Sequence, residues 1–259
     1  MRVLHLIPSI SPLRGGPSQA VLAMVGALRQ RGVDARILTT NDDGPGVLAD
    51  LPLGRWNEHQ GVPLLAFRRW SPPLKPLREF AVAPALSGWL WRHLRAFDLL
   101  HVHALFSFPS TSGMAIARAR RVPYVLRSIG QLNHWSLRQS AGRKQLLLRL
   151  IERRNLQGAA ALHFTSAAEQ GEASSLRLGT PSFVLPLGVE LQPLASAAGE
   201  SQSEHWTGTT FLFLSRLHPK KQLELLFEAL ALLRTRRPEA RWRLQIAGEG
   251  DPAYVERLR

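Results

Sequence analysis

Four basic or titratable side chains crowd one short stretch near the end of the sequence: Arg216, His218, Lys220 and Lys221. They lie between FLFLS, an apolar run typical of a buried strand, and LELLFEALALL, whose apolar residues recur at helical spacing. The start of a helix offers free backbone N–H groups and the positive end of the helix dipole. Cations added at that point predict a site that binds phosphate.

A second candidate for anion binding follows RVLHLI (2–7), the first predicted strand. Gly15 and Gly16 let the backbone approach a ligand closely, and Ser18 can cap the helix that follows. An ordinary turn explains a glycine pair equally well, so both interpretations stand. The spacing is not GxGxxG, which excludes the usual dinucleotide fingerprint.

Two histidines, His101 and His103, stand at the end of another predicted strand, FDLLHVHA (97–104). Alternation along a strand sends both imidazoles to one face, and open α/β sheets bind ligands at the carboxyl ends of their strands. Two histidines on one face can bind a metal, but no third ligand with fitting spacing accompanies them. We therefore expect packed, hydrogen-bonded histidines and no metal.

The composition narrows the classes of partner. Lys and Arg number 33 against 19 Asp and Glu, a net charge of +14, which favours nucleic acid, an anionic membrane or phosphorylated small molecules. No helix-turn-helix, RNA-recognition or zinc motif is present, so we expect no nucleic acid. The chain has no cysteine, which excludes disulfides and cysteine nucleophiles. The N-terminal apolar run is too short for a signal sequence, so we expect a cytoplasmic protein.

A basic segment, WSLRQSAGRKQLLLRLIERRNLQG (135–158), carries six cations and a stripe of leucines. The ordinary interpretation is a solvated helix whose leucines face the core. Six cations without balancing acids also favour peripheral association with anionic lipid at the inner face of the membrane. The aromatic segment 72–97 allows the same two interpretations, and core packing of Trp89, Trp91 and Phe80 is favoured.

The elements that position these residues alternate between strand and helix. We expect strands at 2–7, 34–40, 97–104, 122–128, 160–166 and 182–188, with helices between them. This alternation predicts an α/β fold with a doubly wound, Rossmann-like sheet over residues 1–190. A small, polar linker follows at 191–207, and a second strand, helix and strand begin at 208–259.

The chain contains the motifs GGPSQAV, HVHALFSFPS, VPYVLRSIGQLNHWSL and SRLHPKK, followed by a helix and IAGEGD. The order of these motifs along the chain resembles that of the retaining GT-B glycosyltransferases of the family-four group. Those enzymes transfer a sugar from a nucleotide-diphosphate donor across a cleft between two Rossmann-like domains. The resemblance implies an acceptor-side domain at 1–190 and a truncated nucleotide-sugar-binding domain at 208–259. It implies no cofactor or metal, a nucleotide sugar as donor substrate, and a lipid-linked or saccharide acceptor of envelope or exopolysaccharide assembly.

The same resemblance assigns site residues. It gives the donor diphosphate to Arg216 and Lys221, with Gly15 and Gly16 near the phosphates. Fixed cations there would stabilise the negative charge that the leaving diphosphate gains in the transition state. On the acceptor side of the cleft it suggests three residues: His103, Arg127 and Gly130.

Three departures from the family pattern leave the catalytic residues unassigned. Ile129 precedes Gly130 where a histidine is usual, and Gln222 follows the lysine pair where glycine is usual. The family's carboxylate pair would lie beyond Arg259. We therefore expect this 259-residue chain to bind nucleotide diphosphate weakly and to transfer no sugar. A non-catalytic remnant that binds a nucleotide sugar or a partner is the alternative.

Overall fold

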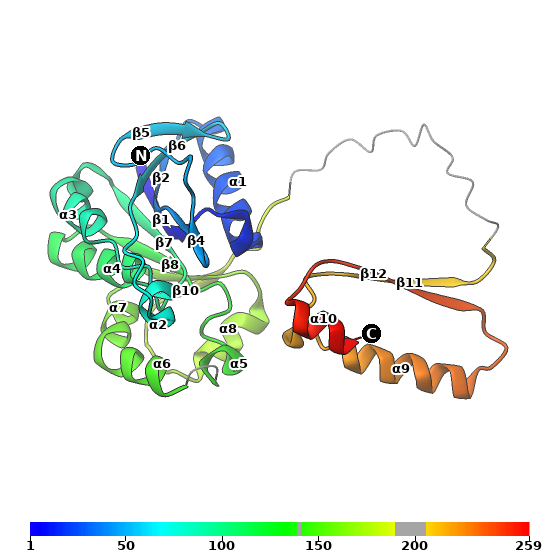
Figure 1. Ribbon diagram of the computed structural model, residues 1–259. Coiled ribbons are helices and arrows are strands. Elements are labelled where there is room, and N and C mark those ends of the chain that lie inside the picture. The colour runs from blue at the N-terminus through cyan, green and yellow to red at the C-terminus, as the bar shows by residue number, and fades with distance from the viewer. Residues whose placement is uncertain (139–140, 190–205, 259) are drawn as a thin grey trace. The chain divides into compact units, whose positions relative to one another are not determined.

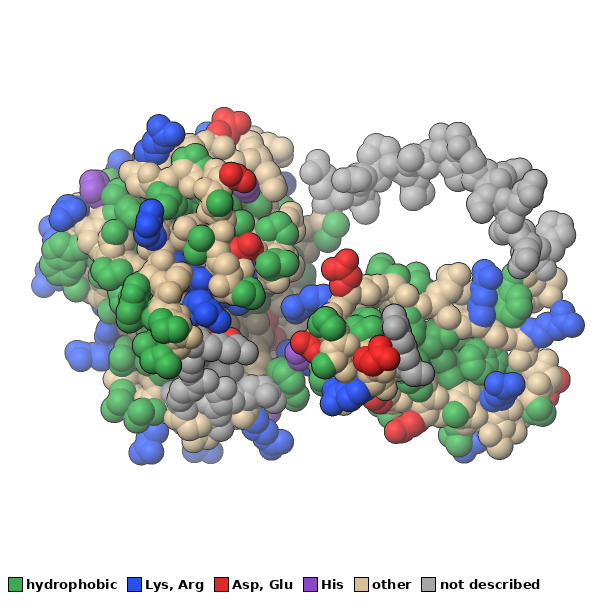
Figure 2. Space-filling model, in the orientation of Figure 1, with side chains coloured by type: hydrophobic (Ala, Val, Ile, Leu, Met, Phe, Trp, Pro, Cys, Tyr) green, Lys and Arg blue, Asp and Glu red, His purple; other side chains and the backbone are tan. Residues whose placement is uncertain are grey.

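The computed structural model describes residues 1–138, 141–189 and 206–258 (Figure 1). It divides into two compact units, Met1–Leu191 and Gln192–Arg259, which are described separately below. The linker predicted at 191–207 lies outside the described residues up to position 205. Lys and Arg side chains are spread over both units on the face that Figure 2 shows.

An eight-stranded sheet forms the centre of the first unit, in the order β10-β9-β8-β7-β1-β2-β6-β5. All neighbours are parallel except β5, which pairs with β6 in an antiparallel hairpin. The strands are β1 Arg2–Ser9, β2 Asp34–Thr40, β5 Trp56–His59, β6 Val62–Phe67, β7 Leu99–His103, β8 Tyr124–Arg127, β9 Ala161–Phe164 and β10 Ser182–Val184. The short pair β3 Asp42–Asp43 and β4 Gly46–Val47 stands apart from this sheet.

Helices cover the two faces of the sheet, as Figure 1 shows. On one face lies α1 (Gly16–Gln30), and on the other lie α3 (Pro84–His93), α4 (Phe108–Arg120) and α7 (Arg153–Gln157). The remaining helical segments of this unit are η1 Pro12–Arg14, α2 Lys75–Glu79, η2 Leu94–Ala96, α5 His134–Arg138, α6 Ala141–Leu147, the π-helical turn η3 Leu148–Glu152 and α8 Ala167–Ser174.

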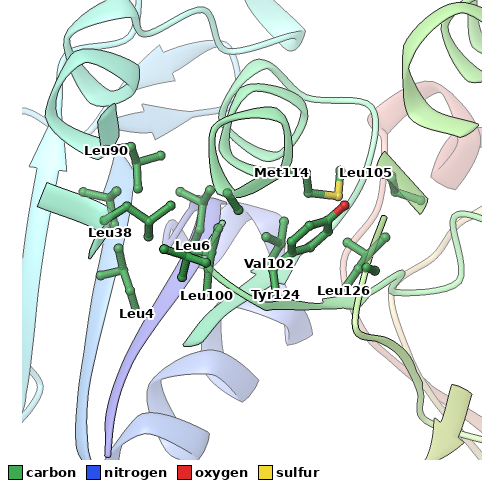
Figure 3. Packing of buried hydrophobic residues seen from close by; sticks show 14 of the residues in the cluster. Leu4, Leu6, Leu38, Leu90, Leu100, Val102, Leu105, Met114, Tyr124 and Leu126 are labelled. Carbon is green, nitrogen blue, oxygen red and sulfur yellow. The ribbon is translucent and has the colours of Figure 1, made fainter. Parts of the chain in front are cut away.

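The core follows the alternation of side chains along each strand. Leu4 and Leu6 of β1 point to the side of α3 and α4, whereas Ile7 joins the cluster under α1 (Figure 3). Each such leucine, removed from water, contributes about 1.5 to 3 kcal/mol to the burial free energy. The doubly wound α/β fold that the sequence predicts is therefore the observed one.

Two expectations for helical segments are wrong in part. Trp89 packs against the core and lies edge-on to Trp56 at 5.8 Å, as favoured above, but Trp91 is half exposed. The segment 135–158 is divided into α5, α6, η3 and α7, and its leucine stripe is not all buried: Leu146 and Leu150 are 60% and 70% exposed. The π-helical turn η3 interrupts the regular helical spacing on which the predicted stripe depends.

The second unit is a strand, helix and strand with a further helix. Parallel strands β11 (Thr209–Leu214) and β12 (Trp242–Ala247) are connected through the 3-10 turn η4 (Pro219–Lys221) and α9 (Leu223–Arg236). Helix α10 (Pro252–Leu258) contributes Tyr254 to a small core with Leu217 and Leu223.

Candidate functional site

A pocket of ≈ 220 Å³ lies at the carboxyl edge of the large sheet. It opens where the strand order reverses, since β1 is followed by β2 on one side and borders β7 on the other. Such a reversal separates the two loops that leave these strands and makes a crevice, which is where open α/β sheets bind ligands. The pocket is lined by Ile7, Pro8, Ser9, Arg14, Pro17, Ser18, Asp42, Glu79, Ala81, Ala104, Leu105, Phe106, Ser107, Ile129 and Gln131.

The predicted glycine pair begins α1 beside this pocket. Gly15 has φ 73° and ψ −144°, a conformation that a side chain would strain, and it is the N-cap residue without any side-chain cap. Ser18 does not cap the helix as expected, because its hydroxyl is buried and donates to the carbonyl of Ser9 at 3.3 Å. No described side chain therefore accepts a hydrogen bond from the first N–H groups of α1. These N–H groups can donate to a bound anion.

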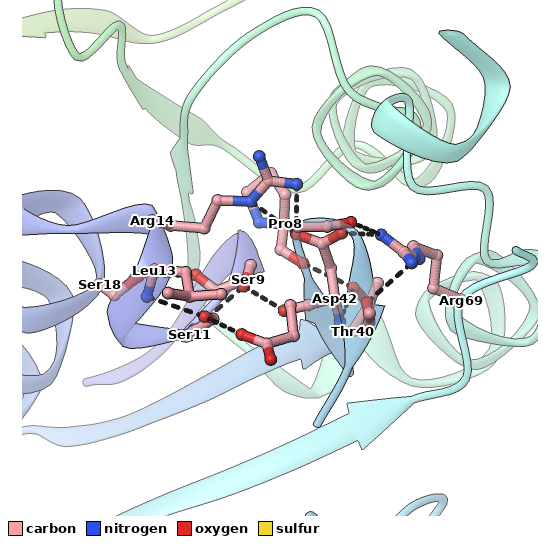
Figure 4. A network of polar contacts seen from close by, with 12 residues as sticks. Pro8, Ser9, Ser11, Leu13, Arg14, Ser18, Thr40, Asp42 and Arg69 are labelled. Atoms are coloured by element: carbon pink, nitrogen blue, oxygen red, sulfur yellow. Dashed lines mark hydrogen bonds and ion pairs between the residues drawn. The ribbon is translucent and has the colours of Figure 1, made fainter. Parts of the chain in front are cut away.

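One buried carboxylate, Asp42, holds two arginines at the edge of the pocket (Figure 4). Arg14 donates to it from Nε at 2.7 Å while its own side chain remains 39% exposed. Arg69 is fully buried, contacts the other carboxylate oxygen, and donates to the carbonyls of Gly44 at 3.0 Å and Gly46 at 2.8 Å. Two guanidinium groups thus share one carboxylate here, and Glu79 adds a second carboxylate to the lining of the pocket.

The loops after β7 and β8 form the opposite wall under backbone strain. Ala104, Phe106 and Ile129 have φ values of 76°, 52° and 54°, and for a branched residue such as Ile129 this conformation is costly. The side-chain oxygen of Gln131 accepts from the N–H of Leu105 and so joins the two loops. Strained residues of this kind concentrate at binding and catalytic sites.

A third loop is tied to this wall through Glu169 of α8. Its carboxylate accepts from Ser128 Oγ and from the N–H of Gly130, both at 2.6 Å, and from the N–H of Thr165 at 2.9 Å. Burial raises the pKa of Glu169, but the hydrogen bonds together outweigh burial and hold the pKa below its ordinary value. The ionised carboxylate fixes the loop in which Ile129 faces the pocket.

His103 and Arg127, predicted to face the cleft, do not line the pocket. Both are buried on the α1 face of the sheet, where the register pairs His103 with Arg127 and Arg127 with His163. Among the described residues, none bonds to the guanidinium nitrogens of Arg127. Burial lowers the pKa of Arg127 to about 10.

The histidines form a cluster, as the alternation of His101 and His103 predicts. Their ring centroids lie 4.3 Å apart, and His5 Nδ1 is 3.0 Å from His103 Nε2. His5 comes from β1, 98 positions before His103, and the sequence pattern did not predict its place in the cluster. Nitrogens of these three residues lie within 4.8 Å of one another, close enough for a metal. The buried cation of Arg127 opposes a second cation there, so hydrogen-bonded histidines remain our prediction.

The basic turn lies in the second unit, between β11 and α9. Arg216 and Lys221 are both exposed there, and the N–H of Lys221 donates to the carbonyl of His218 at 2.8 Å. Gln222 occupies the N-cap position of α9 with a φ of 53°. Glycine adopts this left-handed conformation without strain, which is a physical reason for the usual glycine at this position. The turn and the pocket belong to different units, and each is a candidate by itself.

Comparison with known proteins now adds to this geometry. A GDP-mannose:cellobiosyl-diphosphopolyprenol alpha-mannosyltransferase of Komagataeibacter xylinus is 26% identical over all of this chain. HepE of Anabaena, solved in complex with UDP, aligns over the whole chain with a TM-score of 0.63 at 20% identity. The catalytic domain of starch synthase IV from Arabidopsis thaliana, bound to ADP and acarbose, aligns over the whole chain with a TM-score of 0.62 at 13% identity.

The chain spans 60% of the mannosyltransferase, 64% of HepE and 70% of the starch synthase domain. The two structural alignments show a common fold, which is the GT-B type. The family model described as glycosyl transferase 4-like domain matches residues 15–188, the part of the chain that contains α1, β7, β8 and most of the pocket. This chain therefore belongs to the family of glycosyltransferases with a glycosyl transferase 4-like domain.

Proposed function

We propose that this chain takes part in the transfer of a sugar, with retention of configuration, from a nucleotide-diphosphate sugar to a lipid-linked or saccharide acceptor of polysaccharide assembly. That the 259 residues by themselves transfer no sugar stays a prediction. The observation that carries the proposal is the pocket at the strand-order reversal, which lies largely within the family match. The relative from Komagataeibacter xylinus, named for a GDP-mannose donor and a diphosphopolyprenol acceptor, supports this choice of donor and acceptor.

We assign the acceptor to the pocket of the first unit. Polar groups of Ser9, Asp42 and Gln131 can exchange hydrogen bonds with sugar hydroxyls, while Leu105 and Phe106 offer apolar contacts to a sugar ring. Arg14 and the open start of α1 suit a phosphate of donor or acceptor. Ile129 can neither donate nor accept a proton, so it acts in this site through its shape.

We assign the donor diphosphate to Arg216 and Lys221. Charge builds up on the diphosphate as the glycosidic bond breaks, and a fixed cation interacts more strongly with that transition state than with the bound donor. Side chains of adjacent residues in a turn seldom reach one ligand together, so Lys220 has the smaller role.

Calorimetry with uridine and guanosine diphosphates tests the donor assignment. We expect Arg216→Ala and Lys221→Ala each to weaken binding by roughly tenfold, the loss of one charge-assisted contact. Arg237→Ala, which removes an exposed cation at the opposite end of α9, should leave affinity unchanged. Identical heats for all four proteins would mean that the basic turn is only a solvated surface. Clear sugar transfer by the 259-residue chain would contradict the expectation that these residues alone only bind the nucleotide.

Association with an anionic membrane also stays a prediction. The described part of segment 135–158 exposes four cations, Arg138, Arg149, Arg153 and Arg154. In the described parts of the chain, no helix is both long and apolar enough to cross a bilayer. Peripheral contact through such cations should weaken as salt rises, because the interactions are screened.

A further inference from the structure

We propose that residues 68–78, here called the rim, dock on the surface of an anionic lipid bilayer beside the pocket. The rim follows β6 and includes α2 up to Arg78; the last residue of α2, the exposed Glu79, comes directly after it. The docking surface is independent of the transfer reaction; only its use in delivering a lipid-linked acceptor to the pocket rests on the proposed function.

The base of the rim is firmly anchored. Arg69 points inward, is 2% exposed, and binds Asp42 and the carbonyls of Gly44 and Gly46. The next residue, Trp70, donates its N–H to the carbonyl of Val82 at 2.7 Å. These contacts clamp the start of the rim to β3, β4 and the segment before α3, so the side chains beyond the anchor are held outward.

Apolar side chains of the rim point into water. Trp70, Leu74 and Leu77 are 55%, 62% and 40% exposed. A tryptophan with two leucines on one short segment suits the boundary between lipid headgroups and acyl chains, where an aromatic ring with a polar N–H is favoured. In Figure 2 apolar side chains gather over the position of α2, with basic ones beside them.

The charge of the rim favours docking on an anionic surface. It contains Arg68, Arg69, Lys75 and Arg78, of which Arg69 is buried and paired with Asp42. The exposed acid Glu79 ends α2 directly after the rim, so cations still outnumber acids there. Arg68 is exposed and Arg78 half-exposed, so cations flank the apolar side chains at both ends. Anionic headgroups attract such cations at about 1 kcal/mol each near the surface. A protein partner would have to supply a matching acidic patch, whereas an anionic bilayer supplies apolar and anionic layers together.

The rim is continuous with the pocket. Glu79 and Ala81, immediately after it, line the pocket, and the N–H of Phe108 at the start of α4 donates to the carbonyl of Phe80 at 2.7 Å. Through Asp42 the anchor Arg69 is also joined to Arg14 of the pocket. A bilayer that contacts the rim therefore brings lipid headgroups to the mouth of the pocket.

Vesicle binding by the whole 259-residue chain tests the proposal. One set of vesicles is phosphatidylcholine and the other a mixture of phosphatidylcholine and phosphatidylglycerol. We expect wild type to prefer the anionic vesicles and the triple variant Trp70→Ser, Leu74→Ser, Leu77→Ser to bind them roughly tenfold or more weakly. The matched control Leu225→Ser, Leu232→Ser removes exposed leucines of α9 and should change affinity less than about threefold.

Equal binding by wild type and the rim variant would overturn the proposal, as would loss of binding in the control alone. If the triple variant fails to fold, Arg68→Gln with Arg78→Gln provides a second test, since both lie outside the core. This double variant must weaken binding to the anionic vesicles, and unchanged binding would overturn the proposal. A dimer in lipid-free solution that the rim variant converts to monomer would show a second copy as occupant and refute bilayer docking. No sugar nucleotide is present, so a failure of transfer activity leaves this result intact.

Discussion

A single glutamine, Gln222, carries backbone strain at the start of α9. Its φ of 53° belongs to the left-handed region, which costs a residue with a side chain about 1 kcal/mol relative to glycine, and its side chain is exposed and caps nothing. We predict that Gln222→Gly raises the free energy of unfolding of the second unit by about 1 kcal/mol. Urea titration followed by tryptophan fluorescence checks this. Gln222→Ala keeps the strain and should show no gain.

The buried histidines make the first unit sensitive to acid. Burial lowers the pKa of His5 from 6.5 to about 3, and burial also lowers the pKa of His103. Between pH 6.5 and 3 the unfolded chain binds a proton at His5 that the folded chain does not. Stability is therefore full above pH 6.5 and falls as pH drops, by about 1.4 kcal/mol per pH unit for His5.

Unfolding titrations at pH 7 and pH 5 check this expectation. At pH 5 the His5 contribution alone removes about 2 kcal/mol. His5→Gln should lower stability at pH 7 but reduce the difference between the two pH values. His134→Asn, at an exposed position, should leave the difference unchanged. A pH dependence that survives in His5→Gln in full would contradict the assignment.

At the scale of elements, one glycine, Gly248, determines how closely the loops after β11 and β12 approach each other. A Cβ on Gly248, whose φ is 149°, would lie 1.9 Å from the carbonyl oxygen of Ser215, next to Arg216. We predict that Gly248→Ala destabilises the second unit by roughly 1 to 3 kcal/mol and weakens nucleotide diphosphate binding, because the basic turn must shift. Denaturant unfolding and calorimetry measure both effects. Gly171→Ala in α8, where no atom lies within 4 Å of the added carbon, should be neutral or stabilising.

The sequence patterns predicted the elements that depend on neighbouring residues of the chain alone. Strand β2 occupies the predicted 34–40, and the glycine pair lies where the first loop meets α1. The hairpin of β5 and β6 was not predicted, since WNEH is short and polar and VPLLAF contains a proline. The ion pair of Asp42 with Arg69 was not predicted, because it depends on β2 and β6 lying side by side. The register that places His5 opposite His101 is likewise a tertiary property, which the periodicity of a single strand cannot predict.

For the whole molecule, the division into two units predicts where the chain is cut first. The boundary between the units along the chain falls between Leu191 and Gln192, at the edge of the small, polar linker predicted from sequence. We expect limited proteolysis to cleave first within 191–207 and to release a stable fragment of about residues 1–190. Mass spectrometry identifies the products. First cleavage within the eight-stranded sheet would contradict this division.

The carboxylate shared by Arg14 and Arg69 links the pocket to the rim energetically. A phosphate that draws Arg14 away leaves Asp42 to Arg69 alone, which strengthens the anchor of the rim. Since a coupling free energy acts equally in both directions, a bilayer that holds the rim should raise the affinity of the pocket for an anionic ligand by the same factor. The molecule would then bind its acceptor more tightly at a membrane than in free solution, and one buried aspartate would set the size of that difference.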